Sequence, residues 1–567
     1  MCKPMALSLV AGVLAACLEA GTQAAPIDRI FAPWDKPGSP GCAVAVVRDG
    51  AIATSRAYGF ANLENPTPIS SRTVFDIGSV SKQFTAMSIV LLAQDGKLSL
   101  DDDIHATIGE LPDYGARVSL RQMLHHLSGL PSYTDLFDLA GVPETSLTTD
   151  ADALALIARQ RRLNFAPGAQ YLYSDTNYFL LALVVQRVSG ESLRSFAQRR
   201  IFGPLGMRST HFHDDHTLVV AHRATGYAPR TGGGFAIDMS NFEELGDGSV
   251  MTTVEDMVRW DRNFRDPVVG GPQAIAQLQE PGVRSDGSRT PYAMGLIRDA
   301  YRGFSRVQHT GEWVGYRSAY LRFPDQRLSV ILLCNVVGAL DALGLSERVA
   351  DLYLGTAPPG PPPAPSAAER FAGRYWDSRT LAVLEFAAHG GALALVDADG
   401  EQPLRETGDG AFEAQDSATR FVFAQTGEAM RVQAFSDDGD PVVLERAAAA
   451  GGAAGPDPEG LAGSYYSADL GVSWTLALRG GRLLREQWLF PAQALRPRLP
   501  DVWQGDLSEG SYTLRFVRDA RGKVEGFDVA TGMVRPLRFR RCAPAVPGAN
   551  GPLGMACTSP MDAVPPG

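Results

Sequence analysis

Residues Phe75–Ala86 read FDIGSVSKQFTA, and the main structural and functional predictions begin from this stretch. After Gly78, apolar side chains recur at helical spacing as far as Leu92, which predicts a helix beginning at Ser79. Lys82 follows three residues later, one turn on and on the same face of that helix. A serine hydroxyl becomes nucleophilic when a neighbouring base takes its proton, so the spacing indicates a nucleophile and its base.

Lysine is the basic residue that can act as such a base. Burial and nearby positive charge can lower the pKa of a lysine, whereas arginine keeps its proton in proteins. Of the 52 basic residues in the chain only five are lysines, and one of them is Lys82. Taken alone, the tetrad also fits a helix-start serine followed by a solvated lysine.

Length and charge restrict the class of protein. A chain of 567 residues is too long for one ordinary core, so two to four domains are expected. The net charge of -11 and the pI of about 5.4 argue against a nucleic-acid partner. After the N-terminal segment, no apolar run is long enough to span a bilayer.

The N-terminus is typical of an export signal. Lys3 precedes the apolar run Met5–Ala16, and small residues follow up to Ala24. Residues 1–24 are therefore interpreted as a signal peptide, which places the mature protein in the periplasm or outside the cell. The alternative is the lipoprotein-like box ending at Cys17, in which case a lipid on that cysteine would be the one membrane anchor.

The cysteines suggest one disulfide. Cys542 and Cys557 flank a short Pro/Gly-rich stretch and could pair in an oxidising compartment. Cys42 and Cys334 lie in apolar, strand-like runs, where we expect buried free thiols.

The region 27–356 predicts an α+β domain. Gly41–Val47 and Ile52–Tyr58 form a predicted hairpin, and so do Arg317–Phe323 and Leu328–Cys334. Strands at both ends with helices between them favour an antiparallel sheet with a helical insertion. Further helices are predicted at residues 120–127, 151–159, 178–188, 252–264 and 346–354.

A Pro-rich linker at residues 357–367 separates this domain from a β-rich region. Phe371–Tyr375 and Leu461–Tyr465 resemble each other at an offset of 90 residues (461 minus 371). We therefore predict two similar units, at residues 368–447 and 461–541, followed by a loose tail at 542–567. Closed antiparallel barrels are favoured because they leave no exposed sheet edge.

Two further segments offer groups for acyl transfer. Tyr173 precedes a predicted helix, and a tyrosine beside a cationic lysine can shuttle protons. His309, Thr310 and Gly311 lie at a strand edge, where glycine permits close backbone approach and His309 can donate to a substrate carbonyl or carboxylate. Taken singly, Tyr173 also fits a packed aromatic residue and His309 a satisfied edge residue.

In order and combination these motifs are specific. Ser79–Lys82, then Tyr173–Asp175, then His309–Gly311 resemble the class C type of the serine β-lactamase/penicillin-binding family, across residues 27–356. That group includes D,D-carboxypeptidases, D-aminopeptidases and esterases. Further agreement comes from residues 124–130, 202–207 and 248–256.

The resemblance implies roles for these residues. Ser79 would attack a carbonyl and form an acyl-enzyme, while Lys82 and Tyr173 exchange the protons. Backbone N–H groups of Ser79 and Glu312 would form the oxyanion hole, beside the substrate-binding residues Thr310 and Gly311.

Two positions depart from the pattern. His309 stands where class C β-lactamases carry lysine, which favours the carboxypeptidase, D-aminopeptidase and esterase branches. Asp175 replaces the common asparagine, so an amide donor for substrate binding is lost and a charged Lys82 is favoured.

The expected function is hydrolysis of small amides, peptides or esters, as in D-aminopeptidases or D-alanyl-D-alanine carboxypeptidases. D-aminopeptidases of this family also carry two C-terminal barrels, and barrels near the cleft would select small substrates with a free amine. The alternative is a non-hydrolytic penicillin- or peptide-binding sensor that keeps the fold.

We predict no metal and no cofactor. His211–His216 and the nearby His222 could be imagined as metal ligands, but polar loop residues are usually solvated. The sequence leaves the oligomeric state and the exact substrate open.

Overall fold

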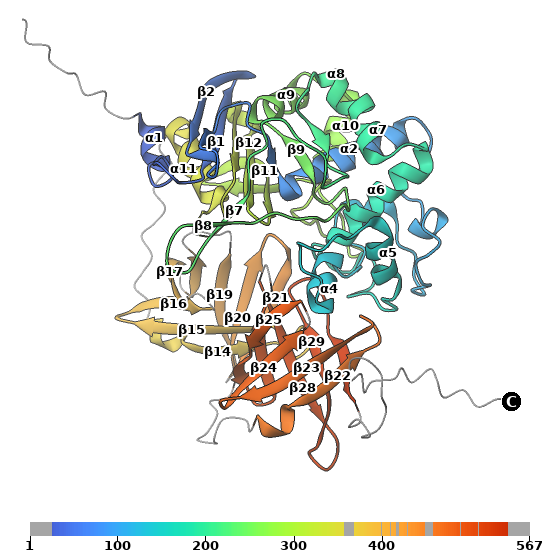
Figure 1. Cartoon of the computed structure of the whole chain (residues 1–567), viewed down its shortest axis with the longest axis vertical. Coiled ribbons are helices and arrows are strands. Elements are labelled where there is room, and N and C mark those ends of the chain that lie inside the picture. The colour runs from blue at the N-terminus through green and yellow to red at the C-terminus, as the bar shows by residue number, and fades with distance from the viewer. Residues whose placement is uncertain are drawn as a thin grey trace, which may run out of the picture.

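The computed structural model describes residues 25–542, apart from 339, 356–367, 398–399, 409, 415–418, 428, 448–457, 488 and 508–509. The predicted signal segment, with Cys17, and the predicted linker therefore lie outside the described residues, as does nearly all of the tail. An N-terminal domain of helices and strands lies against two β units that follow it in the chain (Figure 1). The boundaries given above for these domains stay predictions.

A six-stranded antiparallel sheet forms the centre of the N-terminal domain, in the order β10-β11-β12-β13-β1-β2. Both predicted hairpins are confirmed, and β1 pairs with β13, so the two ends of the domain meet in the middle of the sheet. The strands are β1 (Cys42–Arg48), β2 (Ala51–Tyr58), β10 (Ile297–Tyr301), β11 (Phe304–Trp313), β12 (Tyr316–Phe323) and β13 (Leu328–Cys334).

Helices cover both faces of this sheet. On one face, α1 (Pro26–Phe31) and α11 (Ala342–Leu354) enclose a small apolar core. On the other face lies the large core of the helical insertion, centred on α2 (Lys82–Gln94) and α6 (Asp175–Ser189). The other helices are α3 (Leu120–Leu124), α4 (Tyr133–Ala140), α5 (Asp150–Ala158), α7 (Leu193–Ala197), α8 (Gly203–Leu205), α9 (Val254–Arg265) and α10 (Gly271–Leu278).

Short pieces complete the insertion. One-turn helices are η1 (Gly78–Ser81), η2 (Ile104–Ala106) and η3 (Gln198–Phe202), with η4 (Pro324–Gln326) in the β12–β13 turn. Small strands are β3 (Phe60–Asn62), β4 (Thr67–Pro68), β5 (Phe75–Asp76), β6 (His211–Phe212), β7 (Tyr227–Pro229), β8 (Phe235–Ile237) and β9 (Val250–Thr252). The helix predicted from Ser79 is present, with its first turn in the tighter form η1 before α2 begins at Lys82.

The expectation of free thiols at Cys42 and Cys334 is wrong, because the two cysteines form a disulfide. They stand opposite each other in the β1–β13 register, and both are fully buried. The two cysteines are 292 positions apart in the sequence, so their pairing depends on the strand order, which the sequence pattern did not reveal. Cys542 is also disulfide-bonded, while Cys557 of the predicted pair lies outside the described residues.

The first β unit is a closed antiparallel barrel of consecutive strands, in which β21 pairs back with β14. Aromatic side chains, among them Phe386 and Phe423, fill its core. After the turn η5 (Ala368–Arg370) come β14 (Gly373–Trp376), β15 (Val383–His389), β16 (Ala392–Val396), β17 (Glu401–Gly408), β18 (Ala411–Ala414), β19 (Arg420–Thr426), β20 (Ala429–Ser436) and β21 (Gly439–Arg446).

The second unit repeats this plan with one break. Its nine-stranded sheet has β25 and β26 as edges, and these strands are consecutive in the chain, so together they take the place of β17. After η6 (Glu459–Leu461) come β22 (Gly463–Ser467), β23 (Val472–Arg479), β24 (Arg482–Gln487), β25 (Phe490–Ala494), β26 (Arg496–Leu499), β27 (Val502–Asp506), β28 (Ser511–Arg518), β29 (Val524–Ala530) and β30 (Leu537–Arg541). The predicted fold class, an α+β domain followed by two antiparallel barrels, is confirmed.

The two units contact each other and the N-terminal domain. Arg498 of the second unit pairs with Glu385 of the first at 3.2 Å. The core of the second unit, with Trp474, is continuous with the large core of the helical insertion. Among the described residues, no helix combines the length and apolar character needed to cross a membrane.

Candidate active site

The nucleophile turn and strand β11 lie in direct backbone contact. Gly78 has φ +49°, and a Cβ placed on it would come within 2.8 Å of the backbone nitrogen of Glu312. A Cβ on Gly311 would come within 1.9 Å of the carbonyl oxygen of Ile77. Only glycine permits this approach. It brings the two predicted oxyanion donors, the N–H groups of Ser79 and Glu312, to one place.

Lys82 lies beside the predicted nucleophile. Its side chain is fully buried, and its Nζ is 3.0 Å from Ser79 Oγ. The same nitrogen donates to Asp175 Oδ1 and to the backbone carbonyl of Asp247, both at 2.7 Å.

Asp175 is held in place at the start of α6. Its second oxygen, Oδ2, accepts hydrogen bonds from Ser132 at 3.2 Å and Thr134 at 3.0 Å. Neither carboxylate oxygen can donate while Asp175 is ionised, so the amide donor of the common asparagine is absent. The departure noted in the sequence therefore produces a buried ion pair with Lys82 rather than a contact for a substrate carbonyl.

Tyr173 faces the same lysine. The Nζ of Lys82 lies 4.7 Å from the centre of the Tyr173 ring, and His126 stacks on that ring at 4.3 Å. Burial, and then the charge of Asp175, raise the pKa of Tyr173 well above its ordinary value, while the Ser79 hydroxyl lowers it. The Tyr173 hydroxyl is buried and forms no hydrogen bond of ordinary geometry with the described residues, so it is available to a reacting group.

His309 is neutral and fully engaged, which changes the role expected for it. Its Nδ1 lies 2.6 Å from the Thr310 carbonyl, which can only accept, so the proton is assigned to Nδ1. Nε2 then accepts from the Tyr292 hydroxyl at 3.0 Å. Burial lowers the pKa of His309 to about 4. In this arrangement His309 does not donate to a substrate, contrary to the sequence-based expectation.

The first barrel reaches into the site through the turn between β20 and β21. The carbonyl of Asp438 accepts a hydrogen bond from the Tyr173 backbone N–H at 2.6 Å. The carboxylate of Asp437 accepts from Gln308 at 3.2 Å, next to His309 on β11. The Tyr171 hydroxyl donates to the Asp437 carbonyl. A segment far along the chain thus forms part of the wall around the catalytic groups.

These groups line one pocket of about 640 Å³, a size that suits a small ligand. Among the described residues of its lining, Arg317 is the one arginine and no lysine is present. Arg317 is paired with Glu312 at 3.5 Å. Carboxylates come from every side of the pocket: Asp135, Asp138, Glu144, Asp175, Asp238, Glu244, Asp247, Glu312, Asp341, Asp437 and Asp438.

Comparison with known proteins identifies the family to which this site belongs. The model of the family described as Beta-lactamase matches residues 27–354, more than half of the chain. The chain belongs to the Beta-lactamase family. It is a serine hydrolase of that family, with Ser79, Lys82 and Tyr173 in one cluster.

Relatives in sequence extend past the Beta-lactamase domain. A protein named D-aminopeptidase from Brucella melitensis biotype 2 is 28% identical over 518 residues, covering 88% of this chain and 96% of its own. A protein of the same name from Brucella anthropi is 29% identical over 518 residues and is covered to 95%. Each alignment covers 88% of this chain, more than the Beta-lactamase domain alone, so it extends into the β units that follow.

Solved structures share the fold. The octameric penicillin-binding protein homologue from Pyrococcus abyssi superposes with a TM-score of 0.54 at 22% identity, covering 74% of this chain and 98% of its own. A penicillin-binding protein from Bacillus halodurans gives a TM-score of 0.51 at 24% identity, over 58% of this chain and all of its own.

The structure brings the residues predicted from sequence into one place within this Beta-lactamase-family domain. Ser79, Tyr173, Asp175, His309, Thr310 and Glu312 line the pocket, with Lys82 directly behind Ser79 and Gly311 against Ile77. Their individual roles stay predictions.

Other residues of the site were missed. His126 lies in a stretch already compared with the family, but nothing in the sequence linked it to Tyr173. Tyr292, Asp247, Asp437 and Asp438 carry no motif, and their positions follow from tertiary contacts alone.

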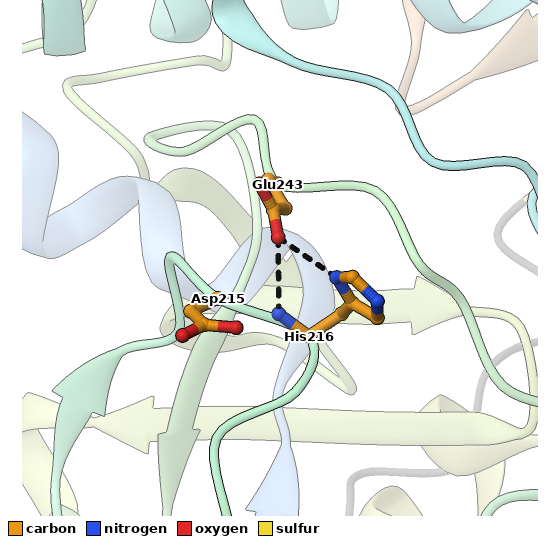
Figure 2. A group of neighbouring side chains, drawn as sticks. All are labelled: Asp215, His216 and Glu243. Atoms are coloured by element: carbon orange, nitrogen blue, oxygen red, sulfur yellow. Dashed lines mark hydrogen bonds and ion pairs between the residues drawn. The ribbon is translucent and has the colours of Figure 1, made fainter.

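The histidine-rich loop does not gather around a common centre. His211 Nε2 and His213 Nδ1 are 3.4 Å apart, and His216 is turned instead toward Glu243. Within the described ranges, the one group of potential metal ligands is Asp215, His216 and Glu243 (Figure 2). There the His216 ring and backbone N–H both contact Glu243, and Asp215 accepts from its own turn at Thr217. These bonds account for the cluster as a loop contact.

Proposed function

We propose that the protein is an exported hydrolase that forms an acyl-enzyme on small D-amino acid amides or peptides with a free amine. The activity corresponds to that of a D-aminopeptidase or amidase, the name carried by its relatives in sequence. The chemistry is supported by the cluster around Ser79, and the choice of substrate by the charge of the pocket.

Acylation begins with Ser79. Its Oγ attacks the substrate carbonyl, the new C–O bond forms, and the carbonyl oxygen becomes an oxyanion between the N–H groups of Ser79 and Glu312. The hydroxyl proton passes to the Lys82 nitrogen while Lys82 gives one of its own protons to Asp175 Oδ1, 2.7 Å away, so the Asp175 carboxylate is the net acceptor. Collapse of the intermediate breaks the C–N bond, and the leaving amine takes the proton.

Deacylation reverses these transfers. A water molecule attacks the ester carbonyl and gives up a proton to the same relay. The acyl C–O bond breaks, and Ser79 regains its proton while the free amino acid leaves. Lys82 therefore acts as the proton-relay group between Ser79 and the Asp175 carboxylate.

The charge of the pocket lining is the basis for the proposed substrate. Carboxypeptidase and β-lactam substrates present a carboxylate, which needs a cation in the site. Here His309 is neutral, and carboxylates line the pocket. One of them is Asp437 of the barrel turn, which contacts Gln308, the neighbour of His309 on β11. Such a pocket attracts an ammonium group and repels a substrate carboxylate.

Export is supported by two features. Residues 1–24 have the pattern of a signal peptide, and the buried Cys42–Cys334 disulfide suits an oxidising compartment. The lipid anchor at Cys17 remains the alternative to cleavage near Ala24. Location of the protein in cell fractions, with and without Cys17→Ala, separates the two.

The test compares three substrates with purified protein. We expect turnover of D-alanine amide, slower turnover of L-alanine amide, and little reaction with N-acetyl-D-alanyl-D-alanine. Ser79→Ala should abolish turnover, whereas Ser71→Ala, a surface serine bonded to Glu255, should not. Faster hydrolysis of N-acetyl-D-alanyl-D-alanine than of D-alanine amide would contradict the proposal.

One observation favours a second function. Burial, and then the charge of Asp175, raise the pKa of Tyr173, so its hydroxyl is rarely ionised and seldom able to accept a proton. A sensor that is acylated but turns over slowly would use the same site. A fluorophosphonate or fluorescent penicillin that labels Ser79 in a protein without turnover of any of the three substrates would favour this function.

A further inference from the structure

A continuous row of aromatic side chains lies along one side of the active-site pocket. The ring centres of Tyr133 and Phe137 are 5.6 Å apart, those of Phe137 and Phe242 are 5.5 Å apart, and those of Phe242 and Trp313 are 5.6 Å apart. All four line the pocket that contains Ser79. Phe242 and Trp313 are half-buried and form the part of the row that is open to a ligand.

This row begins next to the oxyanion donor. Trp313 and Val314 follow Glu312 directly, at the end of β11, and both line the pocket. The barrel turn contacts β11 at Gln308, near the other end of the same stretch. With a rise of about 3.3 Å per residue, Gln308 and Trp313 are separated by roughly 17 Å along the strand. The barrel turn with Asp437 and the aromatic row therefore contact opposite ends of this stretch of β11.

The backbone is strained at Val314, which directly follows β11. Its φ of +38° lies in the left-handed region, which a β-branched side chain strongly disfavours. Glycine would relieve the strain in the turn between β11 and β12. Strained residues persist where the surrounding structure imposes them, often at functional sites. Val314 lines the pocket and also packs against the large apolar core.

The row is also preformed. The loop that carries Phe242 is bound to the segment after α4, since Asn241 N–H donates to the Glu144 carbonyl at 2.9 Å. Glu243 N–H donates to the Thr148 carbonyl at 3.2 Å. These backbone bonds fix Phe242 against Phe137 before any ligand arrives, so binding an apolar group there orders little of the protein.

We propose that Phe137, Phe242, Trp313 and Val314, here called the aromatic wall, bind the side chain of the residue that supplies the scissile carbonyl. The enzyme then prefers amides whose D-side chain is aromatic or large and apolar over those with a small side chain. The inference rests on the proposed function, because it concerns the same acyl-enzyme site.

The experiment measures kcat/KM for D-phenylalanine amide and D-alanine amide. The leaving group is ammonia in both, so only the side chain differs. We expect a preference of about tenfold or more for D-phenylalanine amide, the range that apolar pockets achieve. Trp313→Ala and Phe242→Ala should each lower this preference at least about threefold. Val314→Gly should lower it while leaving the melting temperature unchanged or higher.

The matched control is Phe304→Ala, a half-buried aromatic residue on the same strand that does not line the pocket. It should leave the preference unchanged. Equal kcat/KM for the two amides in the wild type would overturn the aromatic wall, as would a preference untouched by the Trp313, Phe242 and Val314 variants. Loss of the proposed function is distinguishable, because then neither amide is hydrolysed at all.

Discussion

The two C-terminal β units repeat one architecture and are used differently. The first is a closed barrel whose β20–β21 turn enters the catalytic pocket through Asp437 and Asp438. The second is anchored to α4, where the Trp474 indole donates to the Leu139 carbonyl at 2.9 Å and Arg485 donates to the Asp138 carbonyl at 3.1 Å.

The difference teaches how a repeated unit acquires separate tasks. In the first barrel an acidic turn places two carboxylates in the pocket, whereas the second unit contacts the N-terminal domain through Trp474 and Arg485. The second unit does reach the rim of the pocket, through Gly510 and Met533, but neither of these carries charge. We therefore expect changes in the second unit to lower stability, and changes in the first barrel's turn to alter substrate choice.

The largest effect is expected from Trp474→Ala in the second unit. Trp474 is fully buried, and its removal leaves a cavity in a core shared with the helical insertion. The free energy of unfolding should fall by about 3–5 kcal/mol, measured by denaturant titration. Leu489→Ala, at a position 55% exposed in the same unit, should change it by less than about 0.5 kcal/mol. A wild-type stability in Trp474→Ala would show that the second unit is not an anchor.

The next effect is expected from the double change Asp437→Asn and Asp438→Asn in the first barrel. Removing both charges should lower kcat/KM for D-alanine amide by about tenfold or more, with little change in stability. Glu525→Gln, an exposed acid of the second unit, provides the control and should not alter the rate. If Glu525→Gln lowers the rate as much, the net charge of the whole protein, and not this turn, determines the substrate preference.

A smaller effect should appear as a pH dependence. Burial, and then the charge of Asp437, raise the pKa of Asp438 to about 6. Asp438 is therefore ionised above that value and loses its charge as the pH falls through it. We expect kcat/KM for amine substrates to fall below about pH 6, and this limb to be lost in Asp438→Asn. An unchanged limb in the variant would assign it to another group.

The smallest effect is expected from Arg284→Ala. Arg284 forms an ion pair with Asp440, two residues after Asp438, and so holds the barrel turn against the N-terminal domain. Its loss should lower kcat/KM by about two- to fivefold, because the turn becomes less well placed while the charges remain. Combining Arg284→Ala with the two asparagine changes should add little, whereas fully additive losses would show that the turn is positioned independently of Arg284.

The catalytic cluster could be predicted from the sequence because its motifs are local. Ser79 and Lys82 lie one helical turn apart, and Tyr173 precedes a helix whose apolar pattern is clear. The repeated pattern likewise located the two units, since Phe371–Tyr375 and Leu461–Tyr465 fall at the same point of each strand order.

The remaining features depend on contacts between distant segments. No local sequence pattern indicates that Asp438 contacts Tyr173 or that the Tyr292 hydroxyl bonds to His309. Nor does any local pattern indicate that Cys42 pairs with Cys334. In each case the residue type also fits an ordinary structural role, as a turn aspartate, a packed tyrosine or a buried free thiol. The actual role depends on contacts between segments that are far apart in the sequence.

The central claim is that the first barrel's acidic turn completes a site for substrates with a free amine. The most direct measurement is the ratio of kcat/KM for D-alanine amide to that for N-acetyl-D-alanine amide, in the wild type and in the Asp437→Asn and Asp438→Asn double variant. We predict a wild-type ratio of about 100 or more that falls by at least about tenfold in the variant. A wild-type ratio near one, or a high ratio that the variant leaves unchanged, would contradict the claim.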